Sequence, residues 1–287
     1  MQLHVCGVRG STPTSGIAFD RYGGATSCIA LAHDDAAPTL VLDAGTGIRA
    51  VTTLLAGDPF RGTIMLGHLH WDHTQGLPFF RAGDRPDAAV RLLLPEQLDV
   101  ESGATGAPLD VLRRFMSPPH FPIAPDQLRG SWTFEGLRPG RHEVEGFEVL
   151  ALEIPHKGGR TFGYRVSDGR SAIAYLSDHG PSQLGTGPDG WGPYHDAALA
   201  LADGVDVLVH DAQHTAAELK PVAHFGHSAA DYPVRLAELA GATSVLLFHH
   251  DPDRTDDQID ELVASFASSA VPVSAAAEGT IISLGDR

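Results

Sequence analysis

The chain alternates between short apolar runs and longer amphipathic stretches. Apolar runs of roughly four to eight residues are typical of buried strands, and a repeat of apolar positions every three to four residues is typical of a helix. These patterns predict strands over residues 2–7, 25–32, 39–42, 63–66, 89–94, 147–154, 161–166, 171–176, 205–209, 244–248, 271–275 and 280–284. They predict helices over residues 48–56, 194–202, 229–240 and 256–268, with Ser228 as the cap of the third helix.

These elements form two sets, one ending near residue 94 and one beginning near residue 147, and no polar linker divides them. Two sets of strands with interspersed helices favour two sheets packed face to face with helices outside. We therefore expect residues 1–287 to form a single domain of the α/β (α+β) class, a four-layer αββα sandwich of two mixed sheets.

The pattern is interrupted between Glu96 and Gly140. This segment contains many prolines together with Phe115, Phe121 and Trp132, whereas a linker would be polar. Its apolar content indicates a segment that packs, and we expect an insertion over about 96–140 that acts as a lid over a site or as a homodimer contact. An ordinary ordered excursion of the chain is the alternative.

Charge narrows the range of partners. The formal net charge is −16, with 36 acidic and 20 basic residues, which disfavours a surface that gathers polyanions. We therefore expect a small-molecule substrate, and a large nucleic acid is disfavoured. Bound divalent cations would still add local positive charge, enough to hold a single phosphate.

The chain contains no segment that suggests export or membrane insertion. No signal peptide is visible at the amino terminus, and no apolar run approaches the ~20 residues that span a bilayer. Cys6 and Cys28 are the only cysteines, and we expect them to be small buried side chains, with a bridge between neighbouring strands as the alternative. We expect a cytoplasmic location and no membrane partner.

Four candidate metal ligands follow the apolar strand at 63–66 directly. They are His68, His70, Asp72 and His73. Because His68 and His70 are two residues apart in a chain leaving a strand, both imidazoles can face one ion. Asp72 and His73 follow after the chain turns, and a carboxylate beside an imidazole suits a second ion. Surface histidines are the alternative, but this dense spacing is far more specific than a lone histidine.

The pattern His68-x-His70-x-Asp72-His73 resembles the signature of the metallo-β-lactamase superfamily. The longer string HLHWDHTQGLPFF is similar to the ribonuclease Z and phosphodiesterase branch of that superfamily, and so are the segments GVRGSTP and RYGGATSC near the amino terminus. The resemblance implies a two-metal hydrolase with the αββα fold, in which the GVRGSTP loop borders the cleft. We expect the chain to lack the basic arm with which ribonuclease Z proteins grip transfer RNA, because residues 96–140 contain no lysine and few arginines.

The resemblance also implies roles for residues that follow later strands. His156 matches the third histidine of the first metal, and Asp178 matches the carboxylate that bridges both metals. The final ligand of the second metal falls on His249, although strand alternation alone leaves His249 and His250 both open. Asp43 matches an acid that orients a metal-binding histidine, with helix capping as the alternative.

The same resemblance pairs Asp211 with His227 as a proton-donating couple. The complete expected site therefore has these members: metal ligands His68, His70, Asp72, His73, His156, Asp178 and His249, and catalytic residues His227, Asp211 and Asp72. Two divalent ions are implied, with Zn²⁺ as the first choice and Mn²⁺ or Fe²⁺ as alternatives.

The leading hypothesis for function is a dinuclear metal-dependent phosphodiesterase. It would act on a small or cyclic phosphodiester through a hydroxide that bridges the two metals. A hydrolase of lactones, thioesters or β-lactams with the same metals is the runner-up, because a fold does not fix the chemistry. A non-catalytic metal-binding protein comes third, because seven candidate ligands exceed the four of a closed structural site.

Overall fold

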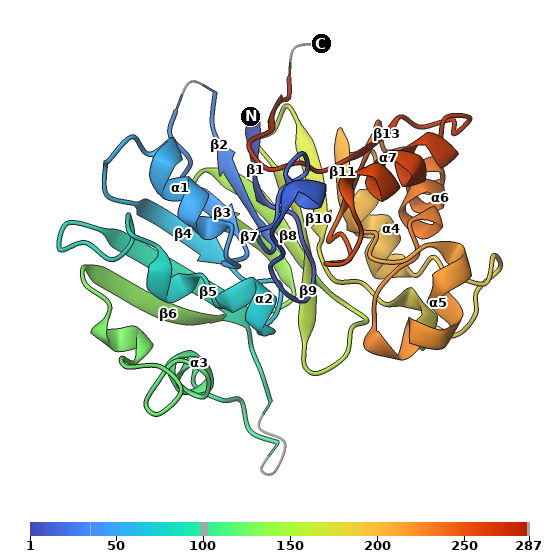
Figure 1. The fold of residues 1–287 in the computed structure, drawn as a ribbon. Coiled ribbons are helices and arrows are strands. Elements are labelled where there is room, and N and C mark those ends of the chain that lie inside the picture. Colours follow the sequence, from blue (N-terminus) through green and yellow to red (C-terminus); the bar gives the residue numbers. More distant parts are fainter. Residues whose placement is uncertain (35, 99–102, 286–287) are drawn as a thin grey trace.

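The structure is a computed structural model, and it describes residues 1–287 apart from residue 35, residues 99–102 and residues 286–287. Two seven-stranded sheets form its centre (Figure 1). The order is β14-β1-β2-β3-β4-β5-β6 in the first sheet and β13-β12-β11-β10-β9-β8-β7 in the second. Both sheets are mixed, since β3 to β6 and β10 to β13 run parallel and the other pairs are antiparallel.

The strands of the first sheet are β1 (Gln2–Gly7), β2 (Cys28–Ala32), β3 (Leu40–Leu42), β4 (Arg61–Met65), β5 (Ala89–Pro95), β6 (Ser131–Leu137) and β14 (Ile281–Ser283). Those of the second are β7 (Gly140–Val144), β8 (Phe147–Ile154), β9 (Thr161–Ser167), β10 (Ala172–Leu176), β11 (Val207–Asp211), β12 (Val245–Phe248) and β13 (Val273–Ala275).

The α-helices are α1 (Ile48–Leu54), α2 (Trp71–Thr74), α3 (Pro108–Arg113), α4 (Asp196–Ala202), α5 (Ala216–Val222), α6 (Asp231–Ala240) and α7 (Asp256–Ser265). Short 3₁₀ turns are η1 (Ile17–Phe19), η2 (Leu77–Phe79), η3 (Pro125–Gln127), η4 (Pro181–Leu184) and η5 (Ala223–Phe225). None of the helices in the described part of the chain has the length and apolar character needed to cross a bilayer.

Three groups of buried apolar side chains explain the layers. The central group comes from both sheets and includes Leu31, Phe147 and Phe248. A second group packs outside the first sheet, around α1, and a third packs outside the second sheet, under α4 and α6. This layering confirms the αββα sandwich expected from the two sets of strands.

Two strands were not expected from the sequence. β6 lies inside the segment 96–140 and pairs in parallel with β5, and β7 begins the second sheet as its edge strand. Both are edge strands, and alternate residues of both face solvent, which weakens the apolar signal. The part of the insertion that lies outside the sheets is therefore shorter than 96–140.

Other differences are local. Ser228 does not cap α6, which begins at Asp231, because the Ser228 hydroxyl donates to the carbonyl of His179 at 2.6 Å. Cys6 and Cys28 are both buried and both free thiols, so the bridge is not formed. Most other strand and helix ends differ from expectation by one to three residues, as fraying ends commonly do.

Candidate metal centre

The candidate ligands lie where strands of both sheets end. His68 follows β4, His156 follows β8, Asp178 follows β10 and His249 follows β12. Because the carboxyl ends of these strands meet at one edge of the sandwich, residues far apart in sequence come together there. The short helix α2 adds Asp72 and His73 from the first sheet.

One cluster contains His68, His70, His156 and Asp178. One donor atom from each of these residues lies within 4.8 Å of the others. His156 is oriented from behind, because its Nδ1 donates to the carbonyl of Gly226 at 2.6 Å and its Nε2 faces His70 Nδ1 at 3.2 Å. Three imidazoles and a carboxylate oxygen form the donor set that zinc prefers.

A second cluster contains Asp72, His73, Asp178 and His249, again with one donor atom each within 4.8 Å. His73 Nε2 lies 2.8 Å from Asp178 Oδ1, and His249 Nε2 lies 3.3 Å from the same oxygen. Asp178 offers Oδ2 to the first cluster, at 3.7 Å from His68 Nε2 and 3.5 Å from His156 Nε2. One carboxylate therefore faces both clusters.

The structure distinguishes the two adjacent histidines after β12. His249 points into the second cluster, with Nε2 at 3.2 Å from Asp72 Oδ2. His250 points away, and its Nε2 donates to the carbonyl of Ala276 at 2.9 Å. His249 is therefore the member of the pair that is placed to bind a metal.

Asp43 lies behind His73 rather than at a helix cap. His73 Nδ1 donates to Asp43 Oδ2 at 2.7 Å, and the other Asp43 oxygen accepts from the backbone of Gly67 at 2.7 Å. Tyr175 and Ser177 of the second sheet also donate to Asp43. This network fixes the ring of His73 so that Nε2 faces the cluster.

The donor atoms of both clusters fit metal ions. His68 has no hydrogen-bond partner on either ring nitrogen, and both oxygens of Asp178 and Nε2 of His73 are buried without one. Such atoms are costly to leave unsatisfied, so a cluster of them at one point indicates a ligand that completes it. Two cations would satisfy one ring nitrogen of His68, Nε2 of His73 and both oxygens of Asp178, and they would offset the buried carboxylates.

The pKa shifts of His68 and His156 in the first cluster and of His73 in the second go in opposite directions. Burial lowers the pKa of His68 well below its ordinary value and that of His156 to about 4, which keeps both rings in the neutral form that metals require. Burial acts on His73 too, but Asp178, Asp72 and Asp43 outweigh it and raise the pKa of His73 well above its usual range. The carboxylates around the second cluster thus favour positive charge at that point.

His227 and Asp211 form a close pair beside these clusters. His227 Nδ1 donates to Asp211 Oδ2 at 2.9 Å and lies 3.7 Å from Asp178 Oδ2. Burial lowers the pKa of His227, but the carboxylate of Asp211 outweighs it and raises that pKa to about 9. His227 also belongs to a third group of potential ligands, with Asp211 and His249.

The loop after β1 borders the site, as the resemblance implied. The backbone N–H of Ser11 donates to Asp72 Oδ2 at 2.7 Å. Ser11 also lines a cavity of about 370 Å³ together with Leu69, His70, Trp71, Asp72, Asp178 and His227. Arg9 holds this loop from inside, since its guanidinium is fully buried and donates to the carbonyls of Asp251 and Arg254.

A chain of three hydrogen-bonded histidines lies behind the His227–Asp211 pair, and it was not predicted from the sequence. His195 Nε2 donates to His179 Nε2 at 2.8 Å, His179 Nδ1 donates to His210 Nε2 at 2.9 Å, and His210 Nδ1 donates to the carbonyl of Asp211 at 2.8 Å. Because the carbonyl oxygen of Asp211 can only accept, Nδ1 of His210 must carry the proton. In neutral rings this leaves Nε2 of His210 and then Nε2 of His179 as acceptors. The available signal was that His179 follows Asp178 and His210 precedes Asp211.

A family model and a curated relative match much of this chain. The model of the beta-lactamase superfamily domain matches residues 39–250. Ribonuclease Z of Exiguobacterium sibiricum is 28% identical over 224 residues, which cover 65% of this chain and 70% of that protein.

Solved structures share the fold. The metallo-beta-lactamase fold protein YhfI from Bacillus subtilis superposes with a TM-score of 0.69 at 17% identity, covering 98% of both chains. The short form of human tRNase Z superposes with a TM-score of 0.66 at 19% identity, covering 99% of both chains.

These relatives correct one expectation from charge. A relative named as a ribonuclease and a neighbour named as a tRNase act on large nucleic acids, so the expectation that a large nucleic acid is disfavoured is wrong. The physical reason is that net charge describes the whole surface. Binding of a polyanion depends on the local charge where the substrate lies, including that of any bound cations.

Proposed function

Because the chain belongs to the beta-lactamase superfamily, which comprises metal-dependent hydrolases, we propose that it is a dinuclear phosphodiesterase. The observation that carries this proposal is the His227–Asp211 pair beside two ligand clusters that share Asp178. Two adjacent cations suit an in-line displacement at phosphorus, and a phosphodiester with an alkoxide leaving group also needs a proton donor. Candidate ligands for the two cations and a candidate proton donor lie together at one edge of the sandwich.

The proposed ligands divide between two ions. His68, His70 and His156 would hold the first ion, Asp72, His73 and His249 would hold the second, and Asp178 would contact both. Zn²⁺ is the proposed metal because three imidazoles and one carboxylate form the first donor set and two imidazoles and two carboxylates form the second, and zinc binds both kinds of donor. When bound, the ions supply Lewis acidity and activate a water for attack.

The chain's own residues then orient the substrate and handle the proton. Asp211 accepts from Nδ1 of His227, which leaves Nε2 as the nitrogen that donates toward the cavity lined by His227. Asp211 is itself fixed by backbone N–H groups of His179 and Gln213, at 3.1 and 3.0 Å. The carboxylate of Asp211 thereby favours the protonated form of His227, which a general acid requires.

A substrate panel tests the proposal directly. The protein, loaded with zinc or with manganese, is assayed on bis(p-nitrophenyl) phosphate, methyl p-nitrophenyl phosphate, a lactone, a thioester and a β-lactam. We expect turnover of the phosphodiesters, with loss of activity after chelation. Turnover of the lactone, thioester or β-lactam without phosphodiester turnover would instead establish the acyl-transfer alternative.

A further inference from the structure

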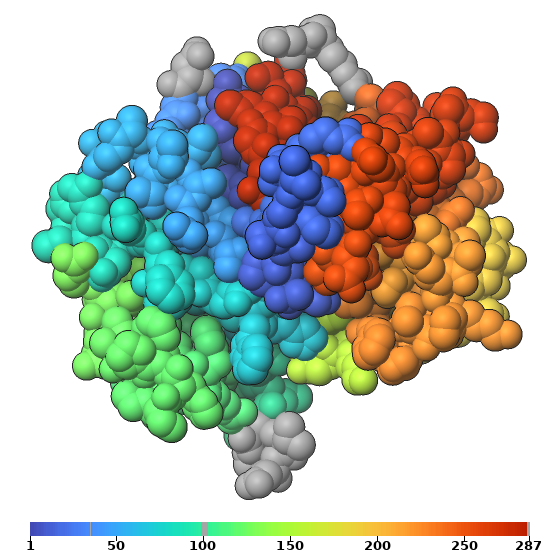
Figure 2. Space-filling view, viewed as in Figure 1, coloured from blue at the N-terminus to red at the C-terminus, as the bar shows by residue number. Residues whose placement is uncertain are grey.

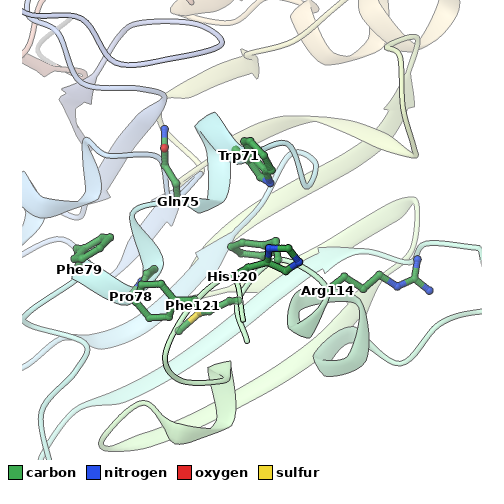
Figure 3. A pocket seen from close by; sticks show the side chains of 9 residues that line it. Trp71, Gln75, Pro78, Phe79, Arg114, His120 and Phe121 are labelled. Carbon is green, nitrogen blue, oxygen red and sulfur yellow. The ribbon is translucent and has the colours of Figure 1, made fainter. Parts of the chain in front are cut away.

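A second cavity adjoins the candidate metal centre and is lined by aromatic side chains. It has a volume of about 450 Å³ and is lined by Trp71, Gln75, Pro78, Phe79, Arg114, Phe115, Met116, His120 and Phe121 (Figure 3). Trp71 lies between the candidate ligands His70 and Asp72 in sequence, and it lines both this cavity and the one at the metal centre. The two cavities are therefore neighbours separated by one indole.

The aromatic surfaces in this cavity are exposed. Trp71 is 73% exposed and Phe79 is 57% exposed, although large apolar side chains usually lose such exposure on folding. The ring of Phe121 meets Phe79 edge-on, with centroids 5.9 Å apart. These rings present faces on which a planar group can stack.

The wall contributed by the insertion is firmly anchored. Leu112 and Met116 are buried, and Leu112 belongs to the apolar group outside the first sheet. Arg113 pairs with Asp110 and Asp126, which connects α3 to η3. In Figure 2 the insertion around α3 and η3 is green and the neighbouring residues of α2 and η2 are cyan, and the two form a continuous surface. The cavity is thus a built feature of the fold.

A third cavity continues the surface on the other side of Phe79. It is lined by Thr46, Arg49, Pro78, Phe79, Arg81, Asp84 and Arg129. Arg129 is paired with Asp84 at 3.0 Å. Arg49 and Arg81 are exposed, and neither has an ion-pair partner among the residues that the structure describes. A local cationic patch therefore lies on a chain whose net charge is −16.

We propose that the second and third cavities together form a subsite for a single-stranded oligonucleotide arm of the substrate, an inference that rests on the proposed phosphodiesterase function. A base stacks among Trp71, Phe79 and Phe121, and the next phosphate lies at Arg49 and Arg81. An aromatic surface beside cationic side chains combines the two features that bind single strands. Because Trp71 joins the subsite to the metal centre, the scissile phosphate and the stacked base belong to one substrate.

Binding of a fluorescein-labelled RNA hexamer tests the subsite, measured by anisotropy with the metals bound and again after chelation, which stops turnover. Trp71→Ala and Phe79→Ala should each weaken binding by roughly five- to 150-fold, the range of one stacked base. Metal content of each variant shows whether the neighbouring ligands are intact. Leu239→Ala, an exposed apolar residue on α6, is the control and should bind as wild type.

Salt dependence tests the arginines. For Arg49→Ala combined with Arg81→Ala, the slope of log affinity against log salt should fall in magnitude by about 0.7 for each phosphate that the variant no longer neutralises. Arg61→Ala is the matched control, because Arg61 is also exposed but begins β4 at the end opposite to the metal ligands. An unchanged slope, or the same change in Arg61→Ala, would overturn the arginine part of the subsite.

Other outcomes separate this inference from the proposed function. Phosphodiester turnover together with wild-type RNA binding in both aromatic variants would refute the subsite and leave the phosphodiesterase standing. RNA binding that depends on Trp71 and Phe79, without turnover of any phosphodiester, would support the subsite and refute the phosphodiesterase. If the aromatic variants instead change the mass of the protein in solution and leave RNA affinity intact, a second copy of the chain covers this surface and the subsite is refuted.

Discussion

At the scale of residues, two side chains of the candidate centre are held by unusual backbone. Asp43 and His249 have φ values of 62° and 57°, in the left-handed region that residues other than glycine seldom occupy. Each follows a buried strand and turns its side chain sharply into the site. Such conformations cost free energy and persist where surrounding contacts fix them, which at this site are the hydrogen bonds of Asp43 and the packing of His249 between the rings of His73 and His227.

The proposed role of His227 as a proton donor depends on a single atom, Nε2. His227→Ala should lower turnover of an alkyl phosphodiester by ~10²- to 10⁴-fold, the usual contribution of a general acid. Turnover of a p-nitrophenyl ester should fall far less, because nitrophenolate leaves without protonation. Steady-state kinetics on both substrates measure the difference.

The control for this prediction is His224→Ala, since His224 is exposed and three residues away. Metal content should stay at the wild-type level in both variants. Equal slowing of the two substrates, or loss of a metal from His227→Ala, would show that His227 is a ligand or a structural residue.

At the scale of elements, the site depends on a close contact between two loops. The backbone N–H of Gly10 donates to the carbonyl of His250, and that of His250 donates to the carbonyl of Val8, both at 2.9 Å. The loop after β1 is thereby paired with the loop after β12. Only a residue without a side chain fits at position 10, because a Cβ there would lie 2.5 Å from Nδ1 of His249.

Gly10→Ala should therefore displace the ring of His249 and weaken the second metal selectively. We expect metal content to fall from two ions to one per chain, since the three atoms nearest to the added Cβ all belong to His249, which is a member of the second cluster and not of the first. Elemental analysis after gel filtration measures this. Gly204→Ala, where an added Cβ meets nothing within 4 Å, should retain both ions; retention of two ions by Gly10→Ala would contradict the assignment of His249.

At the scale of the whole molecule, the candidate centre connects the two sheets. Asp43, Asp72 and His73 come from the first sheet and its loops, whereas Asp178 and His249 come from the second. Tyr164 of β9 adds a link by donating to the carbonyl of Leu66 at 2.6 Å. Ions bound between these residues would therefore hold the halves of the sandwich together at this edge.

Chelation should accordingly lower the stability of the whole protein. Each ion at 100 times its dissociation constant contributes about 2.7 kcal/mol to the folded state, provided that the unfolded chain does not bind it. We expect two ions per chain by elemental analysis and a clear fall in the thermal midpoint after their removal, restored by added zinc. A reproducible stoichiometry of one ion, or an unchanged midpoint, would contradict a two-metal centre between the sheets.

Much of the fold could be predicted from the sequence because its signals are local. A buried strand needs a short apolar run, and most expected strands are present with small shifts at their ends. The cluster from His68 to His73 was also visible, because its ligands lie within six residues and follow a strand directly. Edge strands β6 and β7 were missed because only one residue of each is buried, so neither has a continuous apolar run.

The sequence by itself therefore determined the layered fold and the chemistry available at one strand end. Strand alternation could not decide which of two adjacent histidines faces the site. The resemblance favoured His249, and the tertiary structure shows that His249, at a φ of 57°, faces the second cluster while His250 turns away. The tertiary structure also brought Trp71, Phe79 and Phe121 to one cavity, since that contact depends on how the insertion packs on α2 and η2. Periodicity reports which face of an element is buried, whereas the meeting of residues distant in sequence depends on the packing of all the elements together.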